Sequence, residues 1–288
     1  MDKLKRAERM VAIIQILMAK PNVLIPLTIL VERFSVAKST ISEDLFAVRE
    51  AISFTKLGRL ETVPGSAGGV RYIPEISAEE ANRFLEELAG RLSNKERILA
   101  GGFLYMTDLL FDPAILRTLG LIFAGAFRDK KPDVVVTIET KGIPLALVTA
   151  GALGIPMVII RHGNKVTEGS SVSINYFSGS ARRIQTMTLS RRAVNPGQKI
   201  LIIDDFMKAG GTTRGMINLM GEFGANVVGI AVLIEAASRK TSKLVDRYLS
   251  LLQFNDMELQ EEIIEETSIK YPADLVKVAE RAKNLKFS

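Results

Sequence analysis

The chain has 288 residues, of which 47% are hydrophobic and 24% are charged, a composition that excludes intrinsically disordered and fibrous proteins. It contains no cysteine and one histidine, which excludes disulfide bridges and cysteine–histidine metal cages and fits a reducing compartment. The formal net charge of +6 permits a polyanionic partner without requiring one. We therefore predict a cytoplasmic globular protein, long enough for two domains.

The first twenty residues place basic side chains before an apolar run, which is the order found in signal peptides. Gln15 interrupts the run, and the apolar residues recur at helical spacing, so we predict an amphipathic helix instead. No window reaches the roughly 18 apolar residues that a membrane span needs. We expect no membrane partner.

Two further amphipathic helices are predicted, around 27–34 and 41–52, with only a short turn between them. This arrangement is typical of a helix-turn-helix. The second helix opens with "AKSTISED", whose first turns can meet phosphates or base edges of double-stranded DNA; the candidate contacts are Lys38, Ser39, Thr40 and Ser42. The alternative is that Ser39 only caps the helix and that Ser42 belongs to a solvated face.

A β-hairpin is predicted at 58–74, where two short strand candidates flank a glycine-rich turn. Three helices followed by a hairpin are typical of a winged helix-turn-helix domain. Arg71 and the loop near Ser66 are candidate wing contacts to the DNA backbone. Salt-sensitive phosphate contacts are predicted for basic residues of the first helix, unless these only solvate it: Lys3, Lys5, Arg6 and Arg9.

The domain boundary is predicted just after Pro74, because Ser77 and Glu80 have the spacing of a capping box that starts a new helix. We assign residues 1–75 to the winged DNA-binding domain and residues 76–288 to a second domain.

The second domain alternates apolar strand candidates with helical patterns from Pro132 onward. Strands are predicted at 133–139, 156–160, 184–189, 199–205 and 227–235, and helices at 143–153 and 212–224. Near-continuous valine and isoleucine runs favour an α/β fold with a central, mostly parallel sheet that is covered on both faces. Such sheets bind ligands beyond the carboxyl ends of their strands.

The stretch "KILIIDDFMKAGGTT" combines a buried strand, two carboxylates and a turn of small residues. The turn offers consecutive backbone N–H groups and leads into a helix, so it predicts a phosphate cradle. The carboxylates of Asp204 and Asp205 would repel a phosphate, so we expect them to face sugar hydroxyls or a hydrated magnesium ion. A ligand with a 5-phosphate, a ribose and a metal would satisfy all these groups.

This stretch resembles the signature of the type I phosphoribosyltransferases. The resemblance implies that Asp204 and Asp205 bind the ribose hydroxyls of phosphoribosyl pyrophosphate. It also implies that the turn holds the 5-phosphate, through Lys208, Ala209, Gly210, Gly211, Thr212 and Thr213. The family usually has threonine where this chain has Ala209, so one hydroxyl contact is missing.

Two more segments resemble parts of that family's site. "ETKGIP" corresponds to the pyrophosphate loop and implies contacts from Thr140, Lys141 and Gly142. The polar segment 161–183 corresponds to a flexible loop that closes over the ligand, with Lys165 as a phosphate contact and His162 as a structural or exposed residue.

The remaining segments carry weaker signals. Residues 97–113 are expected to cap the pocket; Tyr105 could reach the ligand there, although a place in the core is the expectation for an aromatic residue. The charged C-terminal segment 256–287 has helical periodicity and is predicted to form a helix pair that supports packing or dimerisation.

A winged start joined to such a domain resembles the purine operon repressors of Gram-positive bacteria, on stretches that span nearly the whole chain, among them "AKSTISEDL", "TVPGSAGGVRYIP", "NKVTEGSSVSINY" and "LIIDDFMKAGGTT". The resemblance implies a homodimeric transcriptional regulator of purine genes that binds operator DNA. Phosphoribosyl pyrophosphate, with or without magnesium, would release the DNA, and guanosine tetraphosphate would compete for the pocket. It implies no catalytic residue, no required cofactor and no metal site of the protein's own; some members activate transcription.

The competing interpretation is an active phosphoribosyltransferase for xanthine or adenine whose winged domain controls its own gene. The run "LIIDDFMKAGG" is also similar to the motif of the xanthine enzyme. The sequence does not reveal a set of residues that would hold a purine base near the reacting carbon.

Overall fold

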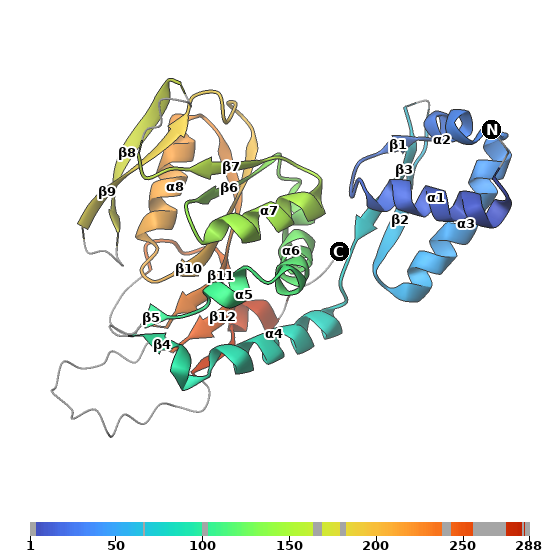
Figure 1. Ribbon diagram of the computed structural model, residues 1–288. Coiled ribbons are helices and arrows are strands. Elements are labelled where there is room, and N and C mark those ends of the chain that lie inside the picture. The colour runs from blue at the N-terminus through green and yellow to red at the C-terminus, as the bar shows by residue number, and fades with distance from the viewer. Residues whose placement is uncertain are drawn as a thin grey trace.

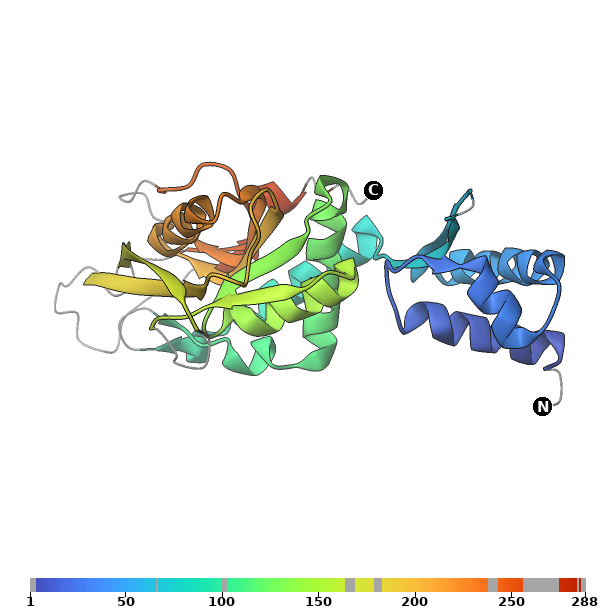
Figure 2. The same cartoon turned by 90° about the horizontal axis from the view of Figure 1, so that it is seen from above.

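The computed structural model describes residues 4–65, 67–99, 103–163, 169–178, 183–237, 243–255, 275–283 and 285. The candidate contacts Lys3, Ser66 and Lys165 lie outside the described residues, as does 256–274 of the predicted C-terminal helix pair. The described chain forms an N-terminal domain at one end of an elongated molecule and a larger α/β domain at the other (Figures 1 and 2).

The N-terminal domain is the predicted winged helix-turn-helix. Its elements are α1 (Arg6–Met18), β1 (Ile25–Pro26), α2 (Leu27–Phe34), α3 (Lys38–Thr55), β2 (Gly58–Val63) and β3 (Gly69–Pro74). The three strands form one antiparallel sheet in the order β1-β3-β2. One apolar side of each helix is buried in a common core, which includes Ile13, Leu30 and Ile41. The periodicity that predicted the helices therefore records the face that each one buries.

Helix α4 (Ala78–Leu92) begins the second domain as its capping box predicts. The Ser77 hydroxyl accepts a hydrogen bond from the Glu80 N–H at 3.2 Å, and the Glu80 carboxylate accepts one from the Ser77 N–H at 3.2 Å. These bonds satisfy two N–H groups that a helix start leaves open. The chain continues through η1 (Lys95–Arg97), β4 (Ile98–Leu99), β5 (Phe103–Leu104) and α5 (Thr107–Leu110).

The central sheet of the second domain has the strand order β13-β12-β11-β10-β6-β7. Its strands are β6 (Val134–Ile138), β7 (Met157–Ile160), β10 (Lys199–Met207), β11 (Asn226–Ala236), β12 (Leu249–Phe254) and β13 (Val276–Val278). All neighbours pair in parallel except β12 and β13, so the predicted mostly parallel sheet is confirmed.

Helices cover both faces of this sheet, which explains why its strands are apolar throughout. On one face α6 (Pro113–Phe127) and α7 (Gly142–Leu153) pack against side chains such as Leu201 and Ile203. On the other face α8 (Gly211–Glu222) packs against side chains such as Ile200 and Ile202. Successive residues of β10 thus point into two different cores.

Three expectations from the sequence were wrong in detail. The strand predicted at 184–189 is β9 (Arg183–Ser190), but it pairs antiparallel with β8 (Ser171–Ser178) in a separate two-stranded sheet. Strand β8 occupies residues 171–178 of the segment that was predicted to be a loop, because its polar residues alternate with apolar ones that pack on α8. In the C-terminal segment, Val276–Val278 extends the sheet as a strand, and only the short α9 (Glu280–Lys283) is helical among its described residues.

No helix within the described ranges is both long and apolar enough to cross a membrane.

Candidate functional site

A cavity of about 630 Å³ lies at the carboxyl ends of β6 and β10, where a parallel sheet is expected to bind its ligands. It brings together segments that are distant in the sequence. Its walls include nearly all the predicted ligand contacts: Tyr105, Thr140, Lys141, Asp204, Asp205 and the whole turn Lys208–Thr213. Gly142 does not line the cavity and lies behind Asp204.

The two aspartates form the floor of the cavity. Asp204 is 6% exposed, and one of its carboxylate oxygens accepts the N–H of Asp205 at 2.9 Å. Burial raises the pKa of the Asp204 carboxyl well above its ordinary value, and the charge of Asp205 adds to the rise. Burial raises the pKa of Asp205 as well, against the attraction of Lys141. A buried carboxylate such as that of Asp204 requires a partner that donates hydrogen bonds or carries positive charge.

Gly142 allows Asp204 to lie directly against the first turn of α7. A Cβ at this glycine would be 2.8 Å from a carboxylate oxygen of Asp204 and 2.5 Å from the Thr137 hydroxyl. No larger residue therefore fits here without displacing one of them. Gly142 was predicted to contact the pyrophosphate directly. In the structure it does not line the cavity, and its lack of a side chain instead makes room for Asp204.

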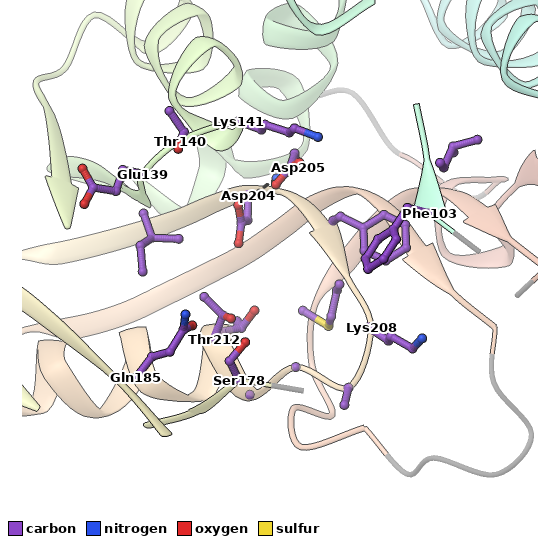
Figure 3. A pocket seen from close by; sticks show the side chains of 18 of the residues that line it. Phe103, Glu139, Thr140, Lys141, Ser178, Gln185, Asp204, Asp205, Lys208 and Thr212 are labelled. Carbon is purple, nitrogen blue, oxygen red and sulfur yellow. Dashed lines mark hydrogen bonds between the residues drawn. The ribbon is translucent and has the colours of Figure 1, made fainter. Parts of the chain in front are cut away.

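The turn after β10 has the form of an anion cradle. Gly210 is in the left-handed conformation, with φ at 84°, and as the N-cap of α8 it has no side chain that could occupy the first N–H groups. The first N–H groups of this 12-residue helix therefore remain open for a ligand, and its dipole favours negative charge there. Thr212 is the second residue of this helix and lies opposite the aspartates (Figure 3).

The second predicted loop lies on the other side of the aspartates. Thr140 and Lys141 are exposed and immediately precede α7, so Asp204 and Asp205 lie between them and Thr212 (Figure 3). The Glu139 side chain points away from this group, because it accepts the His162 N–H at 2.6 Å and pairs with Arg161 at 3.2 Å. His162 is exposed and its backbone has a structural role, in line with the expectation.

The aromatic wall of the cavity was not foreseen from the sequence. Phe103 and Tyr105 are 60% and 42% exposed and line the cavity, so the expectation of a core position for Tyr105 was wrong. Leu104 and Met106, between and after them, are buried. All four residues are apolar or aromatic, so the sequence does not mark which of them face the cavity. Phe206 and Phe254 extend it, with ring centroids 6.4 Å apart.

The sheet of β8 and β9 closes the remaining side. Tyr176 donates a hydrogen bond from its hydroxyl to the Gln185 side chain at 2.9 Å, and both residues line the cavity with Ser178. These residues come from two strands with ordinary alternating sequences. No local pattern marks them, because only the pairing of the strands places them at the pocket.

The candidate DNA contacts of α3 lie on the surface of the N-terminal domain. Lys38, Ser39 and Ser42 are exposed and Thr40 is partly buried. The N-cap of the helix is Ala37, so Ser39 does not cap it, and Ser42 donates a hydrogen bond to the Lys38 carbonyl at 3.0 Å.

The other basic candidates are partly engaged within their own domain. Arg6 is 61% exposed at its side chain and lies 3.5 Å from the buried Asp44. Arg9 is itself buried against Asp44, with a 2.5 Å ion pair, which makes it a structural residue. Arg71 pairs with Glu61 across the hairpin at 2.5 Å, and Lys5 is exposed at the start of α1.

Comparisons with known proteins agree with both halves of this architecture. Residues 5–74 match the family described as the N-terminal part of the bacterial purine repressor, and residues 106–262 match the phosphoribosyl transferase domain. The fold and the pocket thus define a two-domain regulator, in which a winged helix-turn-helix precedes a domain of the phosphoribosyltransferase type.

Whole-length relatives narrow the class further. The chain is 51% identical to the purine biosynthesis transcriptional repressor PurR of Bacillus subtilis, over 91% of this chain and 92% of that one. It is 43% identical to the transcriptional activator PurR of Lactococcus lactis, over 89% and 94%. A xanthine phosphoribosyltransferase of Geobacillus thermodenitrificans is 31% identical over 56% of this chain and 85% of that enzyme. The chain belongs to the family of bacterial purine repressors, the transcriptional regulators of purine biosynthesis.

Proposed function

We propose that residues 1–75 bind operator DNA at purine genes and that phosphoribosyl pyrophosphate, bound by residues 76–288, releases that DNA. The observation that carries this proposal is the acidic pair, the buried Asp204 and the half-buried Asp205, between two loops suited to anions. Neither double-stranded DNA nor a simple phosphate offers sugar hydroxyls to the acidic pair together with phosphates to the anion-binding loops. A phosphorylated sugar that also carries a pyrophosphate does so.

Each part of this ligand has a matching group in the pocket. The 5-phosphate lies at the open N–H groups of Lys208–Thr213, and the ribose hydroxyls donate to Asp204 and Asp205. The pyrophosphate lies at Thr140 and Lys141, where the lysine supplies a point charge. A magnesium ion carried by the pyrophosphate would be held next to the same carboxylates and would neutralise part of the charge.

The direct test is calorimetry with the Asp204→Ala and Asp205→Ala variants. We expect both to lose affinity for phosphoribosyl pyrophosphate, because the ribose hydroxyls lose their acceptors. In a gel-shift assay on DNA from upstream of purine genes, both variants should stay bound at effector concentrations that release the unaltered protein. Unchanged affinity in both variants would falsify the proposed site.

We infer that the protein regulates without transferring phosphoribosyl groups. Relatives of 43% identity or more over about nine tenths of the chain bear the names of regulators, which supports this view. The alternative is an active xanthine phosphoribosyltransferase, favoured by the 31% identity with that enzyme. Incubation with phosphoribosyl pyrophosphate, magnesium and each purine base distinguishes the two, because release of pyrophosphate and formation of a nucleotide would contradict the proposal.

The aromatic wall supports a second ligand for the same pocket. Phe103, Tyr105 and Phe206 offer flat surfaces on which a purine base can stack. A guanine nucleotide with several phosphates, such as guanosine tetraphosphate, would then compete with phosphoribosyl pyrophosphate and favour the DNA-bound form. Displacement of one ligand by the other in calorimetry tests the competition.

Operator binding is proposed to occur as a homodimer through α3 and the wing. The contacts are Lys38, Ser39, Thr40 and Ser42 at bases or phosphates, with Lys5, Arg6 and Arg71 at the DNA backbone. Repression is favoured over activation because the chain is more similar to the repressor than to the activator. Sedimentation measures the oligomer, and a reporter gene measures the sign of regulation.

Release of DNA requires communication between the domains, and hydrogen bonds between described residues of the two domains are available for it. Asn22 donates a hydrogen bond from its side chain to the carbonyl of Ala152 at the end of α7. Arg128 donates one to the Pro74 carbonyl at 2.9 Å. Helix α7 is about 18 Å long and starts at the proposed pyrophosphate loop. A small movement of this helix as a rigid body would therefore carry a change in the pocket to Asn22.

Charge competition is the other way in which the effector could release DNA. The effector is itself an anion, so its binding lowers the positive charge of the protein that attracts DNA. A salt titration of DNA binding with and without effector separates the routes. If the slope of log affinity against log salt is the same in both, charge competition contributes nothing and the domain contacts account for release.

A further inference from the structure

The back of the phosphate cradle is held by a lysine that neither lines the pocket nor appears in any motif. The ammonium of Lys243 donates hydrogen bonds to the carbonyl oxygens of Met207, Lys208 and Ala236, at 3.3, 2.5 and 2.7 Å. The N–H of the next residue, Leu244, donates to the Ala209 carbonyl at 2.9 Å. Three successive carbonyl groups of the cradle, from 207 to 209, are therefore engaged on its outer side.

The direction of these carbonyls decides the direction of the N–H groups. In a planar trans peptide the C=O and the following N–H point in opposite senses. Carbonyls 207, 208 and 209 point outward to Lys243 and Leu244, so the N–H groups of Lys208, Ala209 and Gly210 point toward the cavity that these residues line. A phosphate in the cavity needs this orientation of the peptides.

The lysine is suited to this task by its chemistry and its surroundings. An ammonium has three N–H donors, and here all three have a carbonyl acceptor, in bonds that the positive charge strengthens. Burial lowers the pKa of Lys243, while the buried carboxylate of Glu235 opposes the change and the guanidinium of Arg281 adds to it. The ammonium also carries a positive charge next to the backbone of the turn that is proposed to hold a phosphate.

We propose that Lys243 is a positioning residue for the 5-phosphate of the effector. This proposal rests on the proposed function of the pocket. Lys243 does not touch the ligand; it keeps the N–H groups of the cradle directed at the phosphate and adds a charge behind them. The Thr140–Lys141 loop, across the pocket, does not depend on it.

The test uses the full chain and compares two simple ligands, ribose 5-phosphate and inorganic pyrophosphate, by calorimetry. We expect Lys243→Met to lower the affinity for ribose 5-phosphate by about tenfold or more and to leave that for pyrophosphate within about twofold. Lys199→Met is the matched control, because it removes the same charge from an exposed lysine at the far end of β10. It should change neither affinity.

The outcomes separate the positioning role from general damage. Lys243→Gln keeps two N–H donors without the charge and should lose an intermediate amount of affinity for ribose 5-phosphate. This variant provides the test if the methionine variant does not fold. The proposal is overturned if the variants bind ribose 5-phosphate as tightly as the unaltered chain, or if both ligands lose affinity equally. If the unaltered chain binds neither ribose 5-phosphate nor phosphoribosyl pyrophosphate, the proposed function fails first and this role with it.

Discussion

Replacing Gly142 by alanine tests whether the close approach of α7 to Asp204 sets the affinity of the pocket. Ordinary contact with a Cβ begins at 3.4 Å, and the new methyl would lie 2.5 Å from the Thr137 hydroxyl and 2.8 Å from the Asp204 carboxylate. The two groups would have to withdraw by about 0.9 and 0.6 Å. Thr137 is fully buried, so it has little freedom to move, and the carboxylate must absorb much of the shift.

Hydrogen bonds to a charged group contribute about 1.5–3 kcal/mol each, so a carboxylate moved out of line with the ribose hydroxyls lowers affinity by on the order of 100-fold. We therefore expect Gly142→Ala to bind phosphoribosyl pyrophosphate about 100-fold more weakly in calorimetry, with a loss of about 1–3 kcal/mol in the free energy of unfolding from overpacking. DNA binding should persist, and the effector should fail to release it in a gel-shift assay.

Gly151→Ala is the matched control, because this glycine lies on the same helix and nothing is within 4 Å of its would-be Cβ. It should leave effector affinity unchanged and stabilise the helix by about 1 kcal/mol. If Gly142→Ala bound the effector as tightly as the control, the reasoning from the contact with Asp204 would be refuted.

Three further predictions concern buried charge and domain contact. Because burial raises the pKa of Asp204, the folded state holds its proton more tightly than the unfolded state, so stability falls as pH rises from about 4 toward the raised pKa. Asp204→Asn should flatten this slope and raise the melting temperature at about pH 8; a lower melting temperature there would contradict it. Asp44→Ala leaves Arg9 buried without its partner and should cost about 3–5 kcal/mol in urea unfolding, whereas exposed Glu43→Ala should cost almost nothing. Asn22→Gly keeps the positive φ of 59° but removes the bond to α7, so effector and DNA affinities should persist while effector-induced release weakens in gel shifts.

The parts of the fold that the sequence predicts correctly are those with a local physical cause. A helix that buries one face must repeat apolar residues at its own period, which placed α1 and α3. The capping box at Ser77 predicted the start of α4, since both of its hydrogen bonds join residues three apart. The strand, acidic pair and turn around Asp204 are also contiguous, so one segment sufficed to predict the floor of the pocket and its cradle.

The parts that the sequence did not reveal depend on contacts between distant segments. Strand β8 is amphipathic because α8 covers one of its faces, and its sequence resembles a polar loop. The exposure of Tyr105 follows from the packing of Leu104 and Met106 on the other side of the same segment. Lys243 lies 34 positions from Ala209 and yet belongs to the back of the cradle.

The sequence by itself determined that a winged helix-turn-helix precedes an α/β domain in which a strand ends in an acidic pair and a turn of small residues, because periodicity, capping and turn chemistry act over a few residues. Only the tertiary structure decided what surrounds that motif: an aromatic wall, a glycine against Asp204, a lysine behind the turn and a helix that reaches the DNA-binding domain. These features depend on which elements pack together. The packing is decided by the simultaneous burial of the apolar faces of all the elements, so it cannot be predicted from any single segment.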